Sequence, residues 1–351
     1  MSNARKLADN LPIEGQLGGR NILHNGAMQV SQRHGSSSVT VAANDHFVVD
    51  RFKIQDYSDA TFSSQQVGDA PAGFMHSSKL TVTGTDTSLG TTQYQRFVQP
   101  IEGSNVSHLK WGYGAQAKTV TFSFHVKSSL TGTFYVFAFN SAANRSFVSA
   151  YTIDTADTWE KKIIKITGDQ SGAWLSTTGS VGMYLGWSLG TGTNFQTSTL
   201  DAWQGSFEMA GSNQVNFAGT NGATWQVTGC QLEVGSQASP FENNSYQKEL
   251  EASRRYYQRK YLGNIGIGWA EKANDWNYNS IMLSPQMRAT PTTSYTGGVS
   301  GGTWHSSAAT NGKGFGANSS EVATIYHKAS GAQNDIYVSG NDFYVIADAE
   351  L

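Results

Sequence analysis

The stretch Arg20-Asn21-Ile22-Leu23-His24-Asn25-Gly26-Ala27-Met28-Gln29-Val30-Ser31-Gln32-Arg33 carries the strongest indication of the fold of this chain. Its Asn-Gly pair is a turn signal beside a short apolar strand pattern. Two later segments belong with it: Val49-Asp50-Arg51-Phe52 and Gln231-Leu232-Glu233-Val234-Gly235, the second an alternating run that ends in glycine. Between them lies a long series of short alternating segments. We interpret these three pieces as the opening and closing edges of one jelly-roll sandwich.

The composition favours β-strands joined by turns. Of 351 residues, 38% are hydrophobic, 12% are aromatic and only 14% are charged, and there are 38 glycines. Aromatic and β-branched side chains fit a pleated surface, while glycine and asparagine supply the dihedral angles of turns. The formal net charge of −2 gives no electrostatic support for nucleic acid or an anionic membrane as a partner, and we expect neither.

The cysteine content and the apolar segments exclude several classes. Cys230 is the only cysteine, so an intrachain disulfide and a cysteine-based zinc site are excluded. It lies in a predicted core strand, where we expect a buried structural thiol. No apolar stretch reaches the ~20 residues of a membrane-spanning helix, and the first residues lack the apolar core of a signal peptide. We therefore expect a protein made in a cytoplasm, without membrane insertion.

Alternation of apolar and polar residues predicts an all-β chain in four parts. Residues 1–19 are a polar arm, residues 20–242 an antiparallel jelly-roll β-sandwich, residues 243–262 a linker helix, and residues 263–351 a second small β-sandwich domain. About ten short strand patterns without helical patterns between them favour two antiparallel sheets over a parallel α/β fold.

Two strand patterns predict the core of the sandwich. In Thr119–Lys127 the core side carries Val120, Phe122, Phe124 and Val126, and in Val181–Leu189 it carries Val181, Met183, Leu185, Trp187 and Leu189. A third segment, Phe47–Ile54, is predicted as one continuous strand. These patterns have the period of two that a half-buried strand requires.

The linker helix is predicted from one stripe of side chains at spacings of four and three. The stripe consists of Tyr246, Leu250, Ser253, Tyr257 and Tyr261. Asn244 or Ser245 can cap its start, and Gly263 can stop it. Such a stripe packs either across a sheet edge or against copies of itself, so these five residues are candidates for an oligomer interface.

The chain resembles the tail-fibre-type virion proteins of bacteriophages, especially those of marine and other aquatic bacteria. Besides the three segments above and the start Ser2–Asp9, the residues that carry the resemblance are Phe241-Glu242, Leu250, Arg255-Tyr256-Tyr257, Met287-Arg288-Ala289-Thr290-Pro291 and Ala347-Asp348-Ala349-Glu350-Leu351. The resemblance implies a virion component whose N-terminal arm attaches to other phage tail or virion proteins. On this interpretation we expect a homo-oligomer, specifically a trimer.

A more distant resemblance connects the first domain to carbohydrate-binding jelly rolls. In those proteins the first strand carries an Asn-Gly-x-x-acidic pattern, and the acid often holds a structural calcium. Here Gln29 or its neighbours stand where the acid would be. We therefore expect neither a metal nor a cofactor.

Catalytic motifs are weak. The eight histidines never occur at metal-ligand spacing, and the Gly298–Gly302 segment matches a nucleophile elbow without the strand and helix that an elbow needs. The segment Asp275–Ser280 starts like a calcium loop but has Ser280 where such a loop needs glycine. No pair of catalytic acids can be named, so we expect a protein that is not an enzyme.

Aromatic side chains outside the core stripes are the candidate ligand-binding residues. They are Tyr184, Trp276, Tyr278, Trp304 and His305. Sugars have apolar faces that stack on flat rings, and polar neighbours can fix their hydroxyl groups. Tyr184 lies on the non-core side of its strand between two glycines, so we expect an uncovered ring. Packing into a core or a subunit interface is the alternative for each residue.

The sequence leaves three functions open. The first is a receptor-binding tail fibre in the virion, which recognises host surface polysaccharide or lipopolysaccharide through several weak, shallow sites. The second is a head fibre, decoration or tail-connector protein with a purely structural role. The third is a polysaccharide-degrading tailspike.

Overall fold

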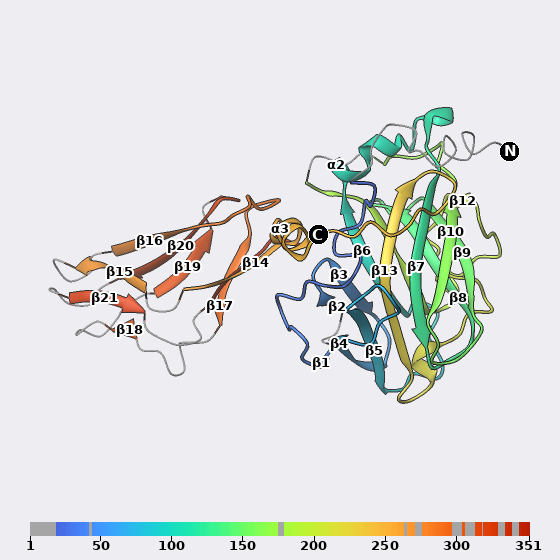
Figure 1. Cartoon of the computed structure of the whole chain (residues 1–351), viewed down its shortest axis with the longest axis horizontal. Coiled ribbons are helices and arrows are strands. Elements are labelled where there is room, and N and C mark those ends of the chain that lie inside the picture. Colours follow the sequence, from blue (N-terminus) through green and yellow to red (C-terminus); the bar gives the residue numbers. More distant parts are fainter. Residues whose placement is uncertain are drawn as a thin grey trace. The chain divides into compact units, whose positions relative to one another are not determined.

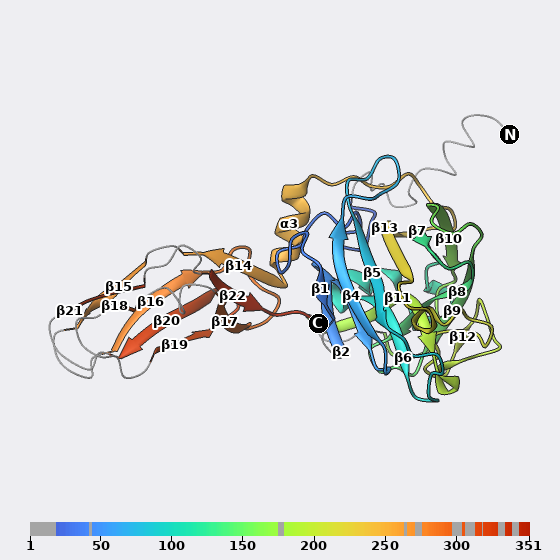
Figure 2. The ribbon, with the colours of Figure 1, turned by 90° about the horizontal axis from the view of Figure 1, so that it is seen from below.

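The computed structural model describes residues 19–41, 44–174, 179–262, 265–270, 276–296, 304–305, 313–317, 319–328, 334–338 and 344–351. The described chain up to Glu249, together with Leu351, forms one compact unit, and residues 250–350 form a second. Figure 1 labels most strands of both units, and Figure 2 also labels β11 and β22. The predicted arm, residues 1–19, lies outside the described residues except for Gly19.

The first unit consists of two antiparallel sheets. The six-stranded sheet has the order β1 (Val39–Thr40), β4 (Thr61–Val67), β5 (Ser77–Gly84), β13 (Thr224–Val234), β7 (Val120–Ser128), β10 (Glu160–Ile166). The seven-stranded sheet has the order β12 (Trp203–Gln204), β9 (Ser146–Ile153), β8 (Gly132–Asn140), β11 (Val181–Thr191), β6 (Tyr94–Glu102), β3 (Phe52–Asp56), β2 (Asn44–Val49). Figure 2 shows the two sheets as layers. The predicted antiparallel jelly-roll sandwich is confirmed.

Short helical turns connect these strands. They are α2 (Gly103–Val106), η1 (Ser107–Leu109), η2 (Gly114–Gln116), η3 (Thr193–Phe195) and η4 (Phe217–Gly219). None of the helices in the described part of the chain is long and apolar enough to cross a membrane.

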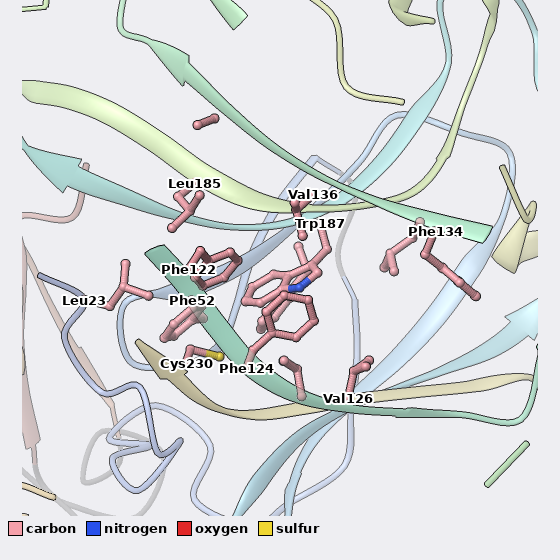
Figure 3. Packing of buried hydrophobic residues seen from close by; sticks show 14 of the residues in the cluster. Leu23, Phe52, Phe122, Phe124, Val126, Phe134, Val136, Leu185, Trp187 and Cys230 are labelled. Atoms are coloured by element: carbon pink, nitrogen blue, oxygen red, sulfur yellow. The ribbon is translucent and has the colours of Figure 1, made fainter. Parts of the chain in front are cut away.

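The core lies between the two sheets and is rich in aromatic rings (Figure 3). The four predicted residues of β7 are buried in it, as are Met183, Leu185, Trp187 and Leu189 of β11, whereas Val181 is only partly buried. The ring of Trp187 lies 5.2 Å from that of Phe122 and 5.3 Å from that of Phe124, between centroids. Period-two alternation therefore predicted the inward faces of both strands.

A buried asparagine joins the first segment of the chain to the hairpin formed by β2 and β3. Asn25 has a backbone φ of +57° and no exposed surface. Its Nδ2 donates to the carbonyl oxygens of Val30 (2.9 Å) and Asp50 (2.8 Å), and its Oδ1 accepts from the Val30 N–H (2.9 Å). Asn25 tolerates this left-handed conformation because its short polar side chain hydrogen-bonds locally.

A second set of bonds joins the same segment to β13. Asn21 Nδ2 donates to the Cys230 carbonyl oxygen (3.0 Å), and Asn21 Oδ1 accepts from the Leu232 N–H (3.0 Å). A Cβ atom on Gly26 would lie only 2.1 Å from the Cys230 oxygen, so this close approach requires glycine. Cys230 is buried, as predicted. We call residues 21–30 with Asp50 and residues 230–232 the edge clamp.

The segment Phe47–Ile54 is not the single strand predicted from its pattern. It forms β2 and β3, separated by Asp50 and Arg51, and Arg51 has a backbone φ of +72°. The Asp50 N–H donates to the Val30 carbonyl oxygen (3.0 Å), and the Asp50 carbonyl accepts from Asn25. A contact between positions so far apart in sequence leaves no trace in the local alternation.

The predicted linker helix is shorter than its stripe. Helix α3 spans Tyr246–Arg254, whereas Tyr257 and Tyr261 belong to strand β14 (Tyr257–Tyr261). Pairing of β14 with β22 (Tyr344–Asp348) overrides the local helical pattern.

The five residues of the stripe therefore do not share one helix face. Tyr246 is 54% exposed and Ser253 is buried, while Leu250 is partly buried. Tyr257 is buried in its strand, and the exposed Tyr261 ring lies 5.3 Å from the Tyr344 ring. The prediction of one continuous helical stripe is wrong, and whether these residues form an oligomer interface stays a prediction.

The described strands of the second unit form three antiparallel sheets of three strands each. The first has the order β14, β22, β17 (Thr292–Thr296). The second has the order β15 (Ile265–Ala270), β21 (Asn334–Val338), β18 (Trp304–His305), and the third has the order β16 (Trp276–Met282), β20 (Val322–Lys328), β19 (Lys313–Ala317). The all-β prediction for this part of the chain is confirmed.

Two histidines stack at the edge strand β2. The rings of His34 and His46 lie 5.1 Å apart at an angle of 14°. Burial, followed by the charges of His34 and Arg33, lowers the pKa of His46 to about 4. Because the charged imidazolium loses its hydration on burial, the neutral ring is the form that the folded chain favours.

Replacing Asn25 by glycine should destabilise the first unit by about 3–5 kcal/mol, since the Val30 and Asp50 backbone groups lose buried partners. Glycine keeps the positive φ accessible, so the change reports the side chain. Urea unfolding followed by tryptophan fluorescence measures the effect. The same substitution at the exposed Asn194 should cost less than about 1 kcal/mol. Equal effects of the two substitutions would contradict the role of the edge clamp.

Lowering the pH from 6.5 to about 4 should destabilise the fold partly through His46. The unfolded chain takes up a proton near the ordinary pKa of 6.5, whereas folded His46 does so only near 4, so stability is lost as the pH falls through this window. The variant His46→Gln should show a flatter dependence of Tm on pH there, measured by scanning calorimetry. His108→Gln, at an exposed position, is the control, and an unchanged slope in His46→Gln would refute the assignment.

Candidate ligand-binding face

The seven-stranded sheet presents aromatic side chains on the face that is turned away from the core. On β6, Phe97 points into the core while Tyr94, Arg96 and Val98 point outward. The strand register places Arg96 opposite Gln55 of β3 and opposite Ser188 of β11. Side chains from three strands are thereby collected on one surface, which we call the outer face.

Contacts between aromatic rings make up much of the outer face. Tyr184 of β11 stacks on Phe139 of β8, its register partner, with centroids 4.7 Å apart and an angle of 18°. Phe207 meets Phe139 edge-on at 4.9 Å, and Phe195 meets Tyr94 edge-on at 5.2 Å. Apart from the buried Phe139, these rings are only partly buried, so each keeps exposed surface. Offset and edge-on contacts of this kind fix the orientation of aromatic rings.

Tyr57 adds an exposed ring at the end of β3. Its centroid lies 4.8 Å from that of Tyr94, and 42% of its surface is exposed. Burial raises the pKa of Tyr94 and that of Tyr184, so both phenols stay protonated at neutral pH. Their hydroxyl groups can therefore both donate and accept hydrogen bonds.

Arg96 lies among these rings with only 7% of its surface exposed. The centroid distances from its Cζ atom are 4.9 Å to Tyr94, 5.0 Å to Phe139 and 5.5 Å to Phe207. Its Nε donates to Gln55 Oε1 (2.7 Å), and its Nη1 contacts the Met209 sulfur (3.4 Å). Burial lowers the pKa of the guanidinium, yet arginine stays charged at neutral pH.

An amide connects Arg96 to a carboxylate. Gln55 Nε2 donates to Asp45 Oδ1 (2.5 Å), while Gln55 Oε1 accepts from Arg96. Asp45 Oδ2 lies 3.5 Å from the Lys53 Nζ atom. The row Asp45, Gln55 and Arg96 thus places acceptor and donor groups next to the rings.

A glycine lets the two central strands approach closely beneath the rings. A Cβ atom on Gly186 would lie 2.2 Å from the Phe97 carbonyl oxygen and 2.9 Å from the Val98 Cα atom. The sequence therefore uses glycine at this point of β11 for backbone packing, and the neighbouring Tyr184 is free to stack on Phe139.

Tyr184 lies on the non-core side of β11, as predicted, but its ring is not uncovered. Because the register places Phe139 opposite, the ring stacks and becomes partly buried. The expectation of an uncovered ring is wrong.

The other predicted residues belong to the second unit. Trp276 and Tyr278 lie on β16, and Tyr278 is 61% exposed; Trp304 and His305 form β18, in a different sheet. The side chains of Trp276, Trp304 and His305 lie outside the described residues. These four residues stay predictions as ligand-binding positions.

Sequence reasoning missed most of the outer face, namely Asp45, Gln55, Tyr57, Tyr94, Arg96, Phe139, Phe195 and Phe207. One signal was available in β8, where Phe134, Val136 and Ala138 alternate with Tyr135, Phe137 and Phe139. A strand that is apolar on both sides predicts a second covered or ligand-binding surface. Among the residues that the structure describes, no three His, Cys, Asp or Glu side chains are grouped so that they could hold a metal ion.

The sequence matches no described protein family and no curated protein. Among solved structures, a bacteriophage CBA120 tailspike domain, described as enzymatically active, aligns at 11% identity over 61% of this chain and 21% of its own, with a TM-score of 0.33. A putative sugar-binding protein from Bacteroides thetaiotaomicron aligns at 10% identity over 62% of this chain and 100% of its own, with a TM-score of 0.32.

A family 11 carbohydrate-binding module from Clostridium thermocellum, in complex with a mixed-linked tetrasaccharide, aligns at 11% identity over 57% of this chain and 100% of its own, with a TM-score of 0.28. At such low identities and TM-scores, no property of these proteins is carried over to this chain.

Proposed function

We propose that the outer face binds a glycan and that binding, without catalysis, is the function of the first unit. The observation that carries the proposal is the combination of partly exposed rings with the Asp45, Gln55 and Arg96 row on one sheet face. The apolar faces of sugar rings stack on aromatic side chains, and sugar hydroxyls exchange hydrogen bonds with amide, carboxylate and guanidinium groups.

The resemblance of the Arg20–Arg33 stretch and its companion segments to phage tail-fibre-type proteins supports a role for this binding in a virion. In that role the chain is a receptor-binding component that is attached through its N-terminal arm. Its ligand is a surface polysaccharide or lipopolysaccharide of the host. Several copies in one trimeric fibre would raise the avidity on the order of 10²–10⁴ over a single weak site.

A purely structural virion role is the second candidate, because aromatic rings on a sheet face also suit packing against another protein. The polar row favours the glycan. Amide and carboxylate groups next to rings match a ligand that is rich in hydroxyl groups better than they match an apolar protein surface. A polysaccharide-degrading tailspike ranks third, since no acid and base pair is assigned.

Replacing Tyr57 and Tyr94 together by alanine should weaken binding of the recognised polysaccharide about tenfold or more, through the loss of ring stacking. Affinity electrophoresis against a panel of purified bacterial surface polysaccharides measures it. Tyr113, which is 55% exposed, provides the control, and Tyr113→Ala should bind like the unaltered chain. Unchanged binding by the double variant would refute the proposed site, and loss of binding only in Tyr278→Ala would transfer the site to the second unit.

A further inference from the structure

We infer that the glycan recognised by the outer face is acidic and that Arg96 contacts its carboxylate or sulfate group. This inference rests on the proposed function of that face and specifies the chemical class of its ligand.

The hydrogen bonds of Arg96 leave room for an anion. A guanidinium carries five N–H donors, and within the described residues two bonds are made, to the Gln55 amide oxygen and to the Met209 sulfur. Both acceptors are uncharged, and a thioether is a weak acceptor. Within the described residues, three N–H groups of Arg96 therefore have no acceptor, and 7% of the surface of the residue is exposed.

The charge of Arg96 is poorly compensated for a residue so deeply buried. The carboxylate of Asp45 is connected to Arg96 only through the Gln55 amide and lies 3.5 Å from the Lys53 Nζ atom as well. Lys53 Nζ also donates to the Leu351 oxygen (3.1 Å), so Asp45 is not the only partner of that cation. Burying a charge without a direct counter-ion costs free energy. An anionic group that binds at Arg96 therefore gains more binding free energy than it would at a solvated arginine.

The surrounding rings fix the orientation of the Arg96 guanidinium for binding of an anionic group. Tyr94 and Phe139 lie with their centroids about equally far from Cζ, at 4.9 and 5.0 Å. Aromatic contacts on a guanidinium limit its rotation and leave its planar edge for a bidentate carboxylate or sulfate. The exposed Tyr57 ring, beside Tyr94, is then available for the sugar ring that carries the acid. A neutral sugar would use the rings and leave the fork of donors without a charged acceptor.

The test compares polymers that differ only in charge. Polygalacturonate and alginate are each paired with their carboxyl-reduced counterparts and dextran sulfate with dextran, and binding to the full chain is measured by titration calorimetry. The expected result is at least tenfold tighter binding of one or more acidic polymers than of the neutral counterpart, with the difference shrinking as salt is added. Carboxylated and sulfated polymers in separate arms identify the anionic group.

Arg96→Gln should abolish the preference, so that the acidic polymer and its neutral counterpart bind with equal affinity. Lys165→Gln, an equal change of charge at an exposed position of β10 in the opposite sheet, should keep the preference. Arg96→Lys, which retains the charge but not the planar fork, should restore only part of it. Thermal unfolding shows whether each variant is folded. Should Arg96→Gln not fold, Arg96→Lys and the salt dependence of the unaltered chain decide.

Equal binding of the acidic and neutral polymers, or a preference that survives in Arg96→Gln, would overturn this inference and leave the proposed glycan-binding function intact. Binding of no polymer of either kind would contradict both. Loss of all binding in Tyr57→Ala/Tyr94→Ala together with an acidic preference in the unaltered chain would support both.

Discussion

The buried side chain of Asn25 is the interaction on which the first unit depends, because it connects residues 25–30 with the turn between β2 and β3. Its hydrogen bonds to Val30 and Asp50 fix residues 25–30 against the turn between β2 and β3. A few residues away from that turn, the two strands carry Asp45 and Gln55 to the outer face. Hydrogen bonds from Asn21 to Cys230 and Leu232 attach the same segment to β13, which belongs to the six-stranded sheet. The edge clamp therefore sets the geometry of the proposed site without touching its ligand.

The seven-stranded sheet has different chemistry on its two faces. Inward, Phe97 and Trp187 belong to a core from which water is excluded. Outward, Tyr94, Arg96 and Tyr184 form a surface in which rings and one deeply placed cation are combined. Because the two sets alternate along the same strands, the rigid core side fixes the positions of the outer side chains. Such preorganisation reduces the entropy that a ligand-binding surface loses when it binds.

The inward half of this arrangement could be predicted from sequence, and the outward half largely could not. Alternation in Thr119–Lys127 and Val181–Leu189 reports which side chains share a face, and one buried face is enough to give the pattern. The covered ring of Tyr184 depends on Phe139 standing opposite in register, and the network of Arg96 depends on Gln55. Register between strands and the pairing of β14 with β22 are long-range properties, so single-strand patterns left them open and extended the helix too far.

The most direct test of the account is a crystal structure of the chain with a bound oligosaccharide from its preferred polysaccharide. The account predicts a sugar ring stacked on Tyr57 or Tyr94 and an acidic oxygen within about 2.7–2.9 Å of the Arg96 guanidinium. A sugar bound elsewhere, for example beside Tyr278 on β16, with no ligand on the outer face, would contradict it.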